Sequence, residues 1–324
     1  MEEVFEYSTS SNGITAIQFT WTGEYFAAAT VDGTVFIFDM DSFSIVKKFD
    51  SLNGPLGQIS WSYDLMSIYV ANGNGIISSL DLSSNSAVDI YSNMAIPVTC
   101  LSSCRTQYGI AAGLADGRII FPSQNRAQPR EIKAHSSLVT SICYHDCGLN
   151  VITGSLDGCI RIWDVFSLKC LKSVLINNHF YINSICFSHK QDTILVSSTG
   201  SSKNDSHLTF LTLPNLEKTA TFDGFQTGRL LLQCGFTVPV GSNNDVYVFS
   251  PNSDGNLMFW QISQPEKTPV MMAQAHKKIF LAAASNPKKP YVVTGGGPSD
   301  SCIRVWKLHM IQNFVVDSSN EFEE

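Results

Sequence analysis

Three polar residues near the middle of the chain have side chains that could do chemistry together. His135, Ser141 and Asp157 supply an imidazole, a hydroxyl and a carboxylate, the three groups of a hydrolase triad. They fall inside a unit that recurs along the chain and that ends in Trp163. A buried indole N–H and a turn carboxylate both need hydrogen-bond partners. This context favours a structural hydrogen-bond network over catalysis.

Two other motifs could bind a metal or a phosphate. Cys143, His145 and Cys147 alternate as C-x-H-x-C, which places all three on one face of a strand entering a turn. A structural zinc site usually uses two ligand pairs, and a fourth ligand is not evident here. The run 295–297 (GGG) lacks the Lys-Ser/Thr that a phosphate loop requires. We therefore expect no enzyme activity, no metal site and no cofactor.

Composition bounds the partners and the compartment. The 324 residues carry 21 Lys and Arg against 28 Asp and Glu, a net charge of -7, with no basic patch, so direct nucleic-acid binding is not expected. The sequence has no apolar run long enough to predict a membrane span, and its acidic N-terminal segment does not resemble a secretory signal. Nine scattered cysteines indicate small core residues rather than disulfides. We expect a protein of the cytoplasm or the nucleus.

A marker recurs along the whole chain: a tight turn beginning with Asp or Asn, then an extended run with a large apolar residue six positions on. The turn residues are Asp32, Asn74, Asp116, Asp157, Asp205, Asp254 and Asp300. Their successive intervals are 42, 42, 41, 48, 49 and 46 residues. Seven markers at this spacing fit seven units of four short strands, the period of WD-repeat propellers.

The fourth unit has the strand pattern that such a blade needs. Segments 138–144, 150–155, 159–164 and 170–175 are rich in β-branched residues and are separated by polar turns. Asp-Gly and Asn-Gly favour tight hairpins, because both central positions tolerate a positive φ. Helical periodicity is weak throughout. The sequence thus predicts an all-β, seven-bladed WD-repeat β-propeller.

The resemblance to WD repeats implies a hydrogen-bonded tetrad in the fourth unit. In it, His135 would bridge Ser141 and Asp157, while Ser141 would reach the indole N–H of Trp163. The seventh unit keeps His276, Asp300 and Trp306 but has Ala282 at the serine position. Other units keep less of the tetrad, as shown by Asp32, Asp254 and Trp260.

Ring closure has two candidate strands. In the WD family the N-terminal segment usually supplies the outer strand of the last blade, and residues 4–8 (VFEYS) have the right position and alternation. The rival is 312–316, at the offset that the outer strand takes in the fourth unit. We prefer the N-terminal strand. The expected domain is a single propeller over 1–316, followed by a disordered acidic tail, 317–324.

One branch of the family is a closer likeness. The stretch 133–174 reads KAHSSLVTSICYHDCGLNVITGSLDGCIRIWDVFSLKCLKSV, and 234–236, 254–260 and 300–306 carry similar signatures. These segments resemble the WD-repeat subunit of COMPASS-type complexes, which methylate lysine 4 of histone H3. The resemblance implies a non-catalytic nuclear scaffold that binds other protein subunits or peptides, as a monomer within a larger complex. The alternative is a WD adaptor of another assembly, such as an RNA-processing or ubiquitin-ligase complex.

That family holds an arginine side chain between two aromatic rings in the central channel. The matching positions are Pro97 and Gln233, with neighbours at Gly57, Ala95, Leu156, Leu230 and Leu231, so no aromatic cage can form. The channel then reads another ligand, or other surfaces assemble the complex. In a family side cleft between the fifth and sixth blades, Phe236 and Val238 match the apolar positions. Phe210 replaces an aliphatic residue there, and Lys190 and Thr193 stand where the family has other polar or aromatic groups. Phe210 and Phe236 could equally be core residues.

Overall fold

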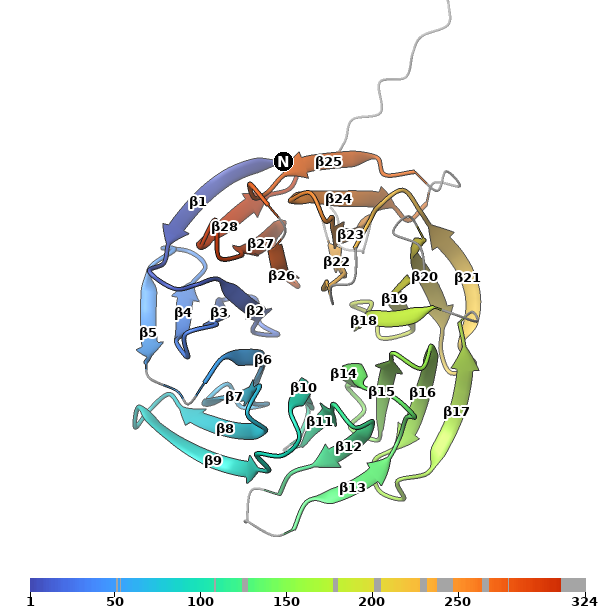
Figure 1. Cartoon of the computed structure of the whole chain (residues 1–324). Helices are drawn as coiled ribbons and strands as arrows, with labels where there is room; N and C mark the ends of the chain where they lie inside the picture. Colours follow the sequence, from blue (N-terminus) through green and yellow to red (C-terminus); the bar gives the residue numbers. More distant parts are fainter. Residues whose placement is uncertain are drawn as a thin grey trace, which may run out of the picture.

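The computed structural model describes residues 1–50, 52, 54–107, 109–123, 128–176, 180–200, 205–227, 232–237, 247–263, 268–278 and 280–309. In these ranges the chain forms strands only, and the strands make seven four-stranded antiparallel sheets. The sheets stand around a central axis like blades (Figure 1). The predicted all-β, seven-bladed propeller is confirmed. Within the described part of the chain, no helix has the length and apolarity needed to cross a bilayer.

The first six blades follow the chain from an inner strand at the axis to an outer strand at the rim (Figure 1). Blade 1 is β2 (Ile14–Phe19), β3 (Tyr25–Thr30), β4 (Val35–Asp39) and β5 (Ile45–Phe49). Blade 2 is β6 (Leu56–Trp61), β7 (Ser67–Asn72), β8 (Ile76–Asp81) and β9 (Ser86–Ser92). Blade 3 is β10 (Val98–Ser103), β11 (Ile110–Leu114), β12 (Arg118–Phe121) and β13 (Arg130–Lys133).

The same order continues in the second half. Blade 4 is β14 (Val139–Tyr144), β15 (Asn150–Ser155), β16 (Cys159–Asp164) and β17 (Cys170–Leu175). Blade 5 is β18 (Tyr181–Phe187), β19 (Thr193–Thr199), β20 (Ser206–Thr212) and β21 (Glu217–Phe222). Blade 6 is β22 (Gly235–Thr237), β23 (Tyr247–Pro251), β24 (Asn256–Gln261) and β25 (Met271–Gln274).

Blade 7 combines the two ends of the chain. Its inner strands are β26 (Phe280–Ser285), β27 (Tyr291–Gly296) and β28 (Cys302–Lys307), and its outer strand is β1 (Glu2–Ser8). β1 pairs antiparallel with β28, from Glu2 opposite Lys307 to Ser8 opposite Cys302. The predicted closure by the N-terminal strand is confirmed. The rival segment 312–316 and the boundary at 316/317 lie outside the described residues, so the domain limit stays a prediction.

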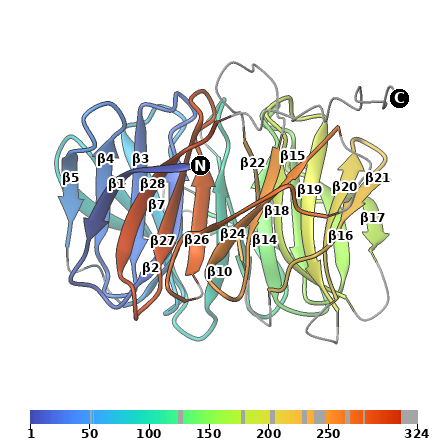
Figure 2. The same cartoon turned by 90° about the horizontal axis from the view of Figure 1, so that it is seen from above.

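Loops join the blades at one face of the disc, and hairpin turns lie at both faces (Figure 2). We call the face that carries the blade-connecting loops, such as 134–138, the upper face. The opposite face, with turns such as 145–149 and 165–169, is the lower face. Each sheet therefore has loops at both faces of the disc and presents the edge of its inner strand to the central channel.

The core lies between adjacent sheets rather than within one. One buried cluster joins Ala27 and Ile37 of blade 1 to Ile59 and Val70 of blade 2. Another joins Ile119 of blade 3 to Trp163 of blade 4. Because each sheet buries its faces only against its neighbours, the ring is stable only when it is complete.

Hairpin glycines allow the connecting loops to approach closely. Gly117 has φ 87°, and a Cβ placed on it would lie 2.4 Å from the carbonyl oxygen of His135. The Gly117 carbonyl in turn accepts a hydrogen bond from the His135 N–H at 2.9 Å. The same contact recurs between Gly255 and His276. The Asp-Gly marker thus serves both the hairpin conformation and the packing of the next loop.

The inner strands are bound to one another by side-chain hydrogen bonds across the blade boundaries. At five of these boundaries, a polar side chain on one inner strand accepts a hydrogen bond from a backbone N–H of the next blade. The pairs are Gln18 with Trp61, Ser60 with Ser103, Ser102 with Tyr144, Ser141 with Ile185, and Ser184 with Cys234, at 3.0–3.1 Å. At blades 6 and 7, the Ser285 hydroxyl donates to the Phe236 carbonyl instead. We call this set the inner belt. It satisfies backbone groups on the inner edges that the sheets leave unpaired.

Candidate functional site

The polar residues of the fourth unit form a buried network in blade 4. His135 Nδ1 lies 3.1 Å from both carboxylate oxygens of Asp157, and its Nε2 lies 2.7 Å from Thr153 Oγ1. Trp163 Nε1 donates to the same Thr153 oxygen at 3.0 Å. His135 sits in the connecting loop, Thr153 on β15, Asp157 at the hairpin turn and Trp163 on β16. The network therefore fastens a loop to three parts of one sheet.

The distances to Asp157 and Thr153 fit a neutral His135. A neutral His135 with its proton on Nδ1 donates to Asp157 and accepts from the Thr153 hydroxyl, which itself accepts from the indole. Burial lowers the pKa of His135 to about 4, and the Arg161 guanidinium beside it acts in the same direction. Burial opposes ionisation of Asp157, but hydrogen bonds from the Cys159 N–H and other donors outweigh it and lower its pKa to about 2.

Blade 7 repeats this arrangement. His276 Nδ1 lies 3.2 Å from Asp300, and its Nε2 lies 2.9 Å from Thr294 Oγ1, which also accepts from Trp306 Nε1 at 2.9 Å. Burial lowers the pKa of His276 to about 4, as in blade 4. The sequence suggested that Ala282 marks a missing hydroxyl in this blade. The network is complete, because Thr294 supplies the hydroxyl.

The assignment of Ser141 to the tetrad was wrong. Its hydroxyl belongs to the inner belt and accepts from the Ile185 N–H at 3.0 Å. The hydroxyl of the network comes from Thr153 on β15, the strand after the inner one, which is within hydrogen-bond distance of both the imidazole and the indole. Sequence reasoning missed Thr153 and Thr294. Both follow their histidine by 18 residues, a regularity that could have identified them.

In other units, the residues that match the aspartate and the tryptophan of the network make local hydrogen bonds. Asp32 accepts from the Asn12 N–H at 3.0 Å and so holds the connecting loop of blade 1. Asp254 accepts from the N–H and the side-chain amide of Asn256, within its own turn. The Trp260 indole donates to the Asp223 carbonyl at 2.9 Å. These residues stabilise turns and blade packing without a histidine.

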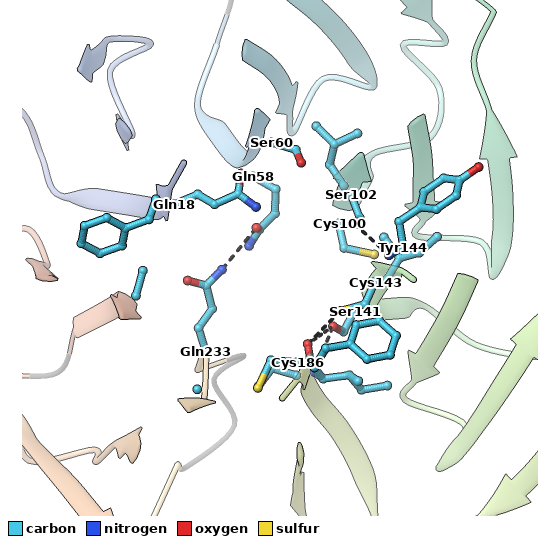
Figure 3. A pocket seen from close by; sticks show the side chains of 18 of the residues that line it. Gln18, Gln58, Ser60, Cys100, Ser102, Ser141, Cys143, Tyr144, Cys186 and Gln233 are labelled. Atoms are coloured by element: carbon cyan, nitrogen blue, oxygen red, sulfur yellow. Dashed lines mark hydrogen bonds between the residues drawn. The ribbon is translucent and has the colours of Figure 1, made fainter. Parts of the chain in front are cut away.

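The inner strands enclose a cavity of about 330 Å³ on the axis, which opens at the lower face beside Trp21, Arg105 and His189. Its wall carries hydroxyl, thiol and amide groups, and Gln18, Gln58 and Gln233 extend into it (Figure 3). Gln233 Nε2 donates to Gln58 Oε1 at 3.2 Å, which links blades 2 and 6 across the channel. Arg105 is the one Lys, Arg, Asp or Glu among the described lining residues.

The predicted channel positions are spread over several elements. Gly57 is the extra residue of a β-bulge in β6, Ala95 and Pro97 are exposed in the loop before β10, and Leu156 is in the turn after β15. Gln233 alone among them lies in the cavity wall, and Leu230 and Leu231 lie outside the described residues. Gln233, at one of the two positions compared with aromatic rings above, thus forms an amide pair with Gln58 in the channel.

Two of the expected side-cleft residues pack against each other in the core. Phe210 and Phe236 stack with their centroids 5.6 Å apart and an interplanar angle of 9°. They are 6% and 4% exposed and belong to the core between blades 5 and 6. This favours the core role that the sequence left open. Lys190 is exposed in the turn before β19, Thr193 begins β19, and Val238 lies outside the described residues.

The C-x-H-x-C residues have other partners. Cys143 on β14 donates to the Ile185 carbonyl at 3.0 Å, and His145 Nδ1 accepts from the Cys147 N–H at 3.1 Å. Burial raises the pKa of the Cys143 thiol to about 12, which disfavours the thiolate that a metal would need. Among the described residues, no group of three or more His, Cys, Asp or Glu side chains is placed to hold a metal ion.

Comparison with known proteins identifies the repeats. Residues 1–39, 127–164 and 267–307 match the WD domain, G-beta repeat. The chain contains WD40 repeats. The matched segments end at the third strands of blades 1, 4 and 7, and two of these blades hold the His-Asp-Thr-Trp network. Propellers of this type generally present loops on a rigid ring for protein binding.

Several WD proteins are similar in sequence at low identity. The chain is 22% identical to the WD repeat-containing protein slp1 of Schizosaccharomyces pombe over 302 residues, 89% of this chain and 57% of slp1. It is 25% identical to the pre-mRNA-splicing factor cwf17 of the same yeast over 47% of this chain and 46% of that protein. It is 24% identical to the Denticleless protein homolog of Danio rerio over 53% of this chain and 27% of that protein. The chain thus spans about half of slp1 and less of the others.

A solved structure has the same architecture. The β-propeller domain of Cps50 (Swd1) from Myceliophteria thermophila superposes with a TM-score of 0.75. The match covers 94% of this chain and 100% of that domain at 17% identity. At this identity the likeness establishes the seven-bladed WD propeller fold.

Proposed function

We propose that this protein is a non-catalytic scaffold subunit of a COMPASS-type complex that methylates lysine 4 of histone H3, and that it acts in the nucleus. The observation that carries the scaffold role is the use of the chemistry-bearing residues in structure. His135 and Asp157 bind Thr153 and Arg161, and Ser141 binds the next blade. These groups stabilise the ring and do not converge on a reaction centre.

The complex is proposed from two kinds of likeness. The segments 133–174, 254–260 and 300–306 resemble the WD-repeat subunit of COMPASS-type complexes. The fold superposes on the Cps50 (Swd1) propeller domain over nearly its full length. The Gln58–Gln233 pair, together with the non-aromatic Pro97 and Gln233 at the two ring positions, argues against an arginine ligand in the channel, so the proposal assigns assembly to other surfaces.

Affinity purification from cells tests this proposal. The tag belongs at the C-terminus, because β1 at the N-terminus completes blade 7. Mass spectrometry of the native complex should recover a SET-domain methyltransferase subunit in amounts comparable with the bait. Recovery without any SET-domain protein would remove the proposal. A parallel purification of the Thr153→Val variant, in which the blade 4 network is weakened, shows whether recovery of the partners depends on the stability of the fold.

A second candidate is an adaptor of another assembly. The sequence relatives include a pre-mRNA-splicing factor and a Denticleless homologue. The same purification separates the candidates, since splicing or ubiquitin-ligase subunits would then replace the methyltransferase among the recovered proteins.

A further inference from the structure

A second cavity, of about 470 Å³, opens between blades 3 and 4 at the lower face. It lies away from the channel, between the end of β12 and the turn that follows β16. We call it the blade 3–4 pocket; the residues that matter here are Gln107, Phe121, Gln128, Arg130, Tyr144 and Phe166. Neither the network of His135 nor the inner belt uses the side chains of these residues.

Among the described residues that line this pocket, the charge is unbalanced. Arg130 is the one charged residue among its described lining residues, in a chain whose net charge is -7. The Arg130 guanidinium lies 5.5 Å from the centroid of the Phe121 ring, and its Nη1 donates to the Phe166 carbonyl at 3.3 Å. These contacts orient the guanidinium without neutralising it. No described Asp or Glu forms an ion pair with Arg130.

A second donor faces the same space. The ring of Tyr144 is packed in the core between blades 3 and 4 and is 7% exposed. Its hydroxyl group has no hydrogen-bond partner among the described residues. Gly109 leaves room beside it, since a Cβ on Gly109 would lie 3.1 Å from Tyr144 Oη. Burial raises the pKa of Tyr144 to about 12, so the phenol stays protonated and can donate.

Apolar surface lies on both sides of these donors. Half-buried Pro122 belongs to blade 3 and exposed Phe166 to blade 4, while Phe121 and Val165 are buried in the core between these blades. Phe166 is 64% exposed, unusually open for an aromatic residue. A ligand that satisfies the donors would therefore have apolar groups on either side of its acceptor.

We propose that the blade 3–4 pocket binds a Glu or Asp side chain that apolar residues flank within an extended segment of a partner protein. Arg130 and Tyr144 donate to the carboxylate, and the flanking residues pack on Pro122 and Phe166. A charge-assisted hydrogen bond in a partly dry site contributes more than a neutral one, so Arg130 dominates the affinity. The inference rests on the proposed scaffold role, but not on the methyltransferase complex.

Peptide selection on the full chain tests the pocket. The probe is a display library of random 12-residue peptides, selected on protein that is immobilised through its C-terminus. Enriched peptides should carry Glu or Asp between apolar residues. Their synthetic, C-terminally amidated forms should bind, and replacing the acidic residue by Gln or Asn should weaken binding about tenfold or more. Binding that requires a free C-terminal carboxylate, or no enrichment of acidic peptides, would overturn the proposal.

Variants of the chain locate the binding. Arg130→Gln should weaken the selected peptides about tenfold or more, and Tyr144→Phe should weaken them about threefold to tenfold. Gly109→Ala should also weaken them, because its methyl group occupies the space before the phenol. Lys172→Gln removes one charge from the exposed outer strand of blade 4 and should change nothing. Equal binding by wild type and Arg130→Gln, with unchanged melting temperatures, would exclude the pocket.

The two proposals fail separately. A random library contains no methyltransferase subunit, so its outcome does not depend on which complex the purification recovers. Purification without a SET-domain protein, together with Arg130-dependent peptide binding, would remove the methyltransferase role and keep the pocket.

Discussion

The hydroxyl of Thr153 lies 2.7 Å from His135 Nε2. Thr153 is on β15, the strand that follows the inner strand of blade 4. Thr294 and His276 repeat this pair in blade 7 at 2.9 Å. In both blades the threonine also accepts from a buried tryptophan. One hydroxyl therefore completes the hydrogen bonding of two rings that would otherwise be buried with unpaired nitrogens.

Thr153→Val should lower the free energy of unfolding by about 1–3 kcal/mol, because it leaves His135 Nε2 and the Trp163 indole unsatisfied at nearly constant volume. Urea unfolding measures this loss. Thr140→Val is a matched control in the same blade, since the Thr140 hydroxyl is buried without a hydrogen-bond partner. That substitution should be neutral or stabilising, and similar losses in both variants would count against the network.

Double-mutant cycles should separate the network from the inner belt. Ser141→Ala alone should cost about 0.5–1.5 kcal/mol, because Ile185 loses one acceptor. His135→Ala with Ser141→Ala should give additive losses, whereas His135→Ala with Thr153→Ala should cost less than the sum. If Ser141 and His135 couple more strongly than Thr153 and His135, our assignment of the hydroxyl is wrong.

Acid should destabilise the ring in a window set by two histidines. The pKa values of His135 and His276 are lowered to about 4 in the folded state, against about 6.5 in the unfolded chain. Between these values the unfolded chain binds more protons, so stability falls as pH decreases from about 6.5 towards 4. Each histidine should cost about 2 kcal/mol at pH 5 relative to pH 8.

Urea midpoints at pH 8 and pH 5 measure this loss. A variant with both His135→Gln and His276→Gln should be less stable at pH 8 but should lose much less on acidification. A pH dependence as steep as that of the wild type would show that other groups govern acid stability.

Removal of residues 1–8 should destabilise the ring by about 5 kcal/mol or more and expose the edge of β28. Phe5 stacks on Phe43 at 5.3 Å, and Tyr7 contacts Phe38 at 5.4 Å, so the deletion uncovers aromatic surface on blade 1. The pair between Arg304 and Glu6, at 3.1 Å, is also lost. Thermal unfolding and light scattering measure stability and association.

The control for this deletion is removal of 317–324, which the sequence places outside the propeller. That truncation should leave the melting temperature unchanged. Equal stability of the chain without residues 1–8 would contradict the closure.

The sequence predicted the ring because its signal is repeated and local. Turn residues such as Asp157 and Asp254 mark every blade, and an Asp-Gly pair has few conformations to choose from. Ser141 misled because the six-residue spacing from His135 is equally compatible with a contact to the neighbouring blade. Only the direction of the side chain decides between these contacts. The blade 3–4 pocket was not predicted, since Arg130 and Tyr144 line it from two different blades and no spacing rule records such a pair.

The pairing of β1 with β28 joins residues that are about three hundred positions apart in the chain. Ribosomes add roughly 5–20 residues per second, so the first strand waits on the order of 15–60 s before its partner emerges. During that time Phe5, Tyr7 and the aromatic face of blade 1 lack their final cover. Biosynthesis of this protein thus leaves aromatic side chains uncovered until about three hundred further residues have been translated, and we expect chaperones that bind nascent chains to associate with this segment.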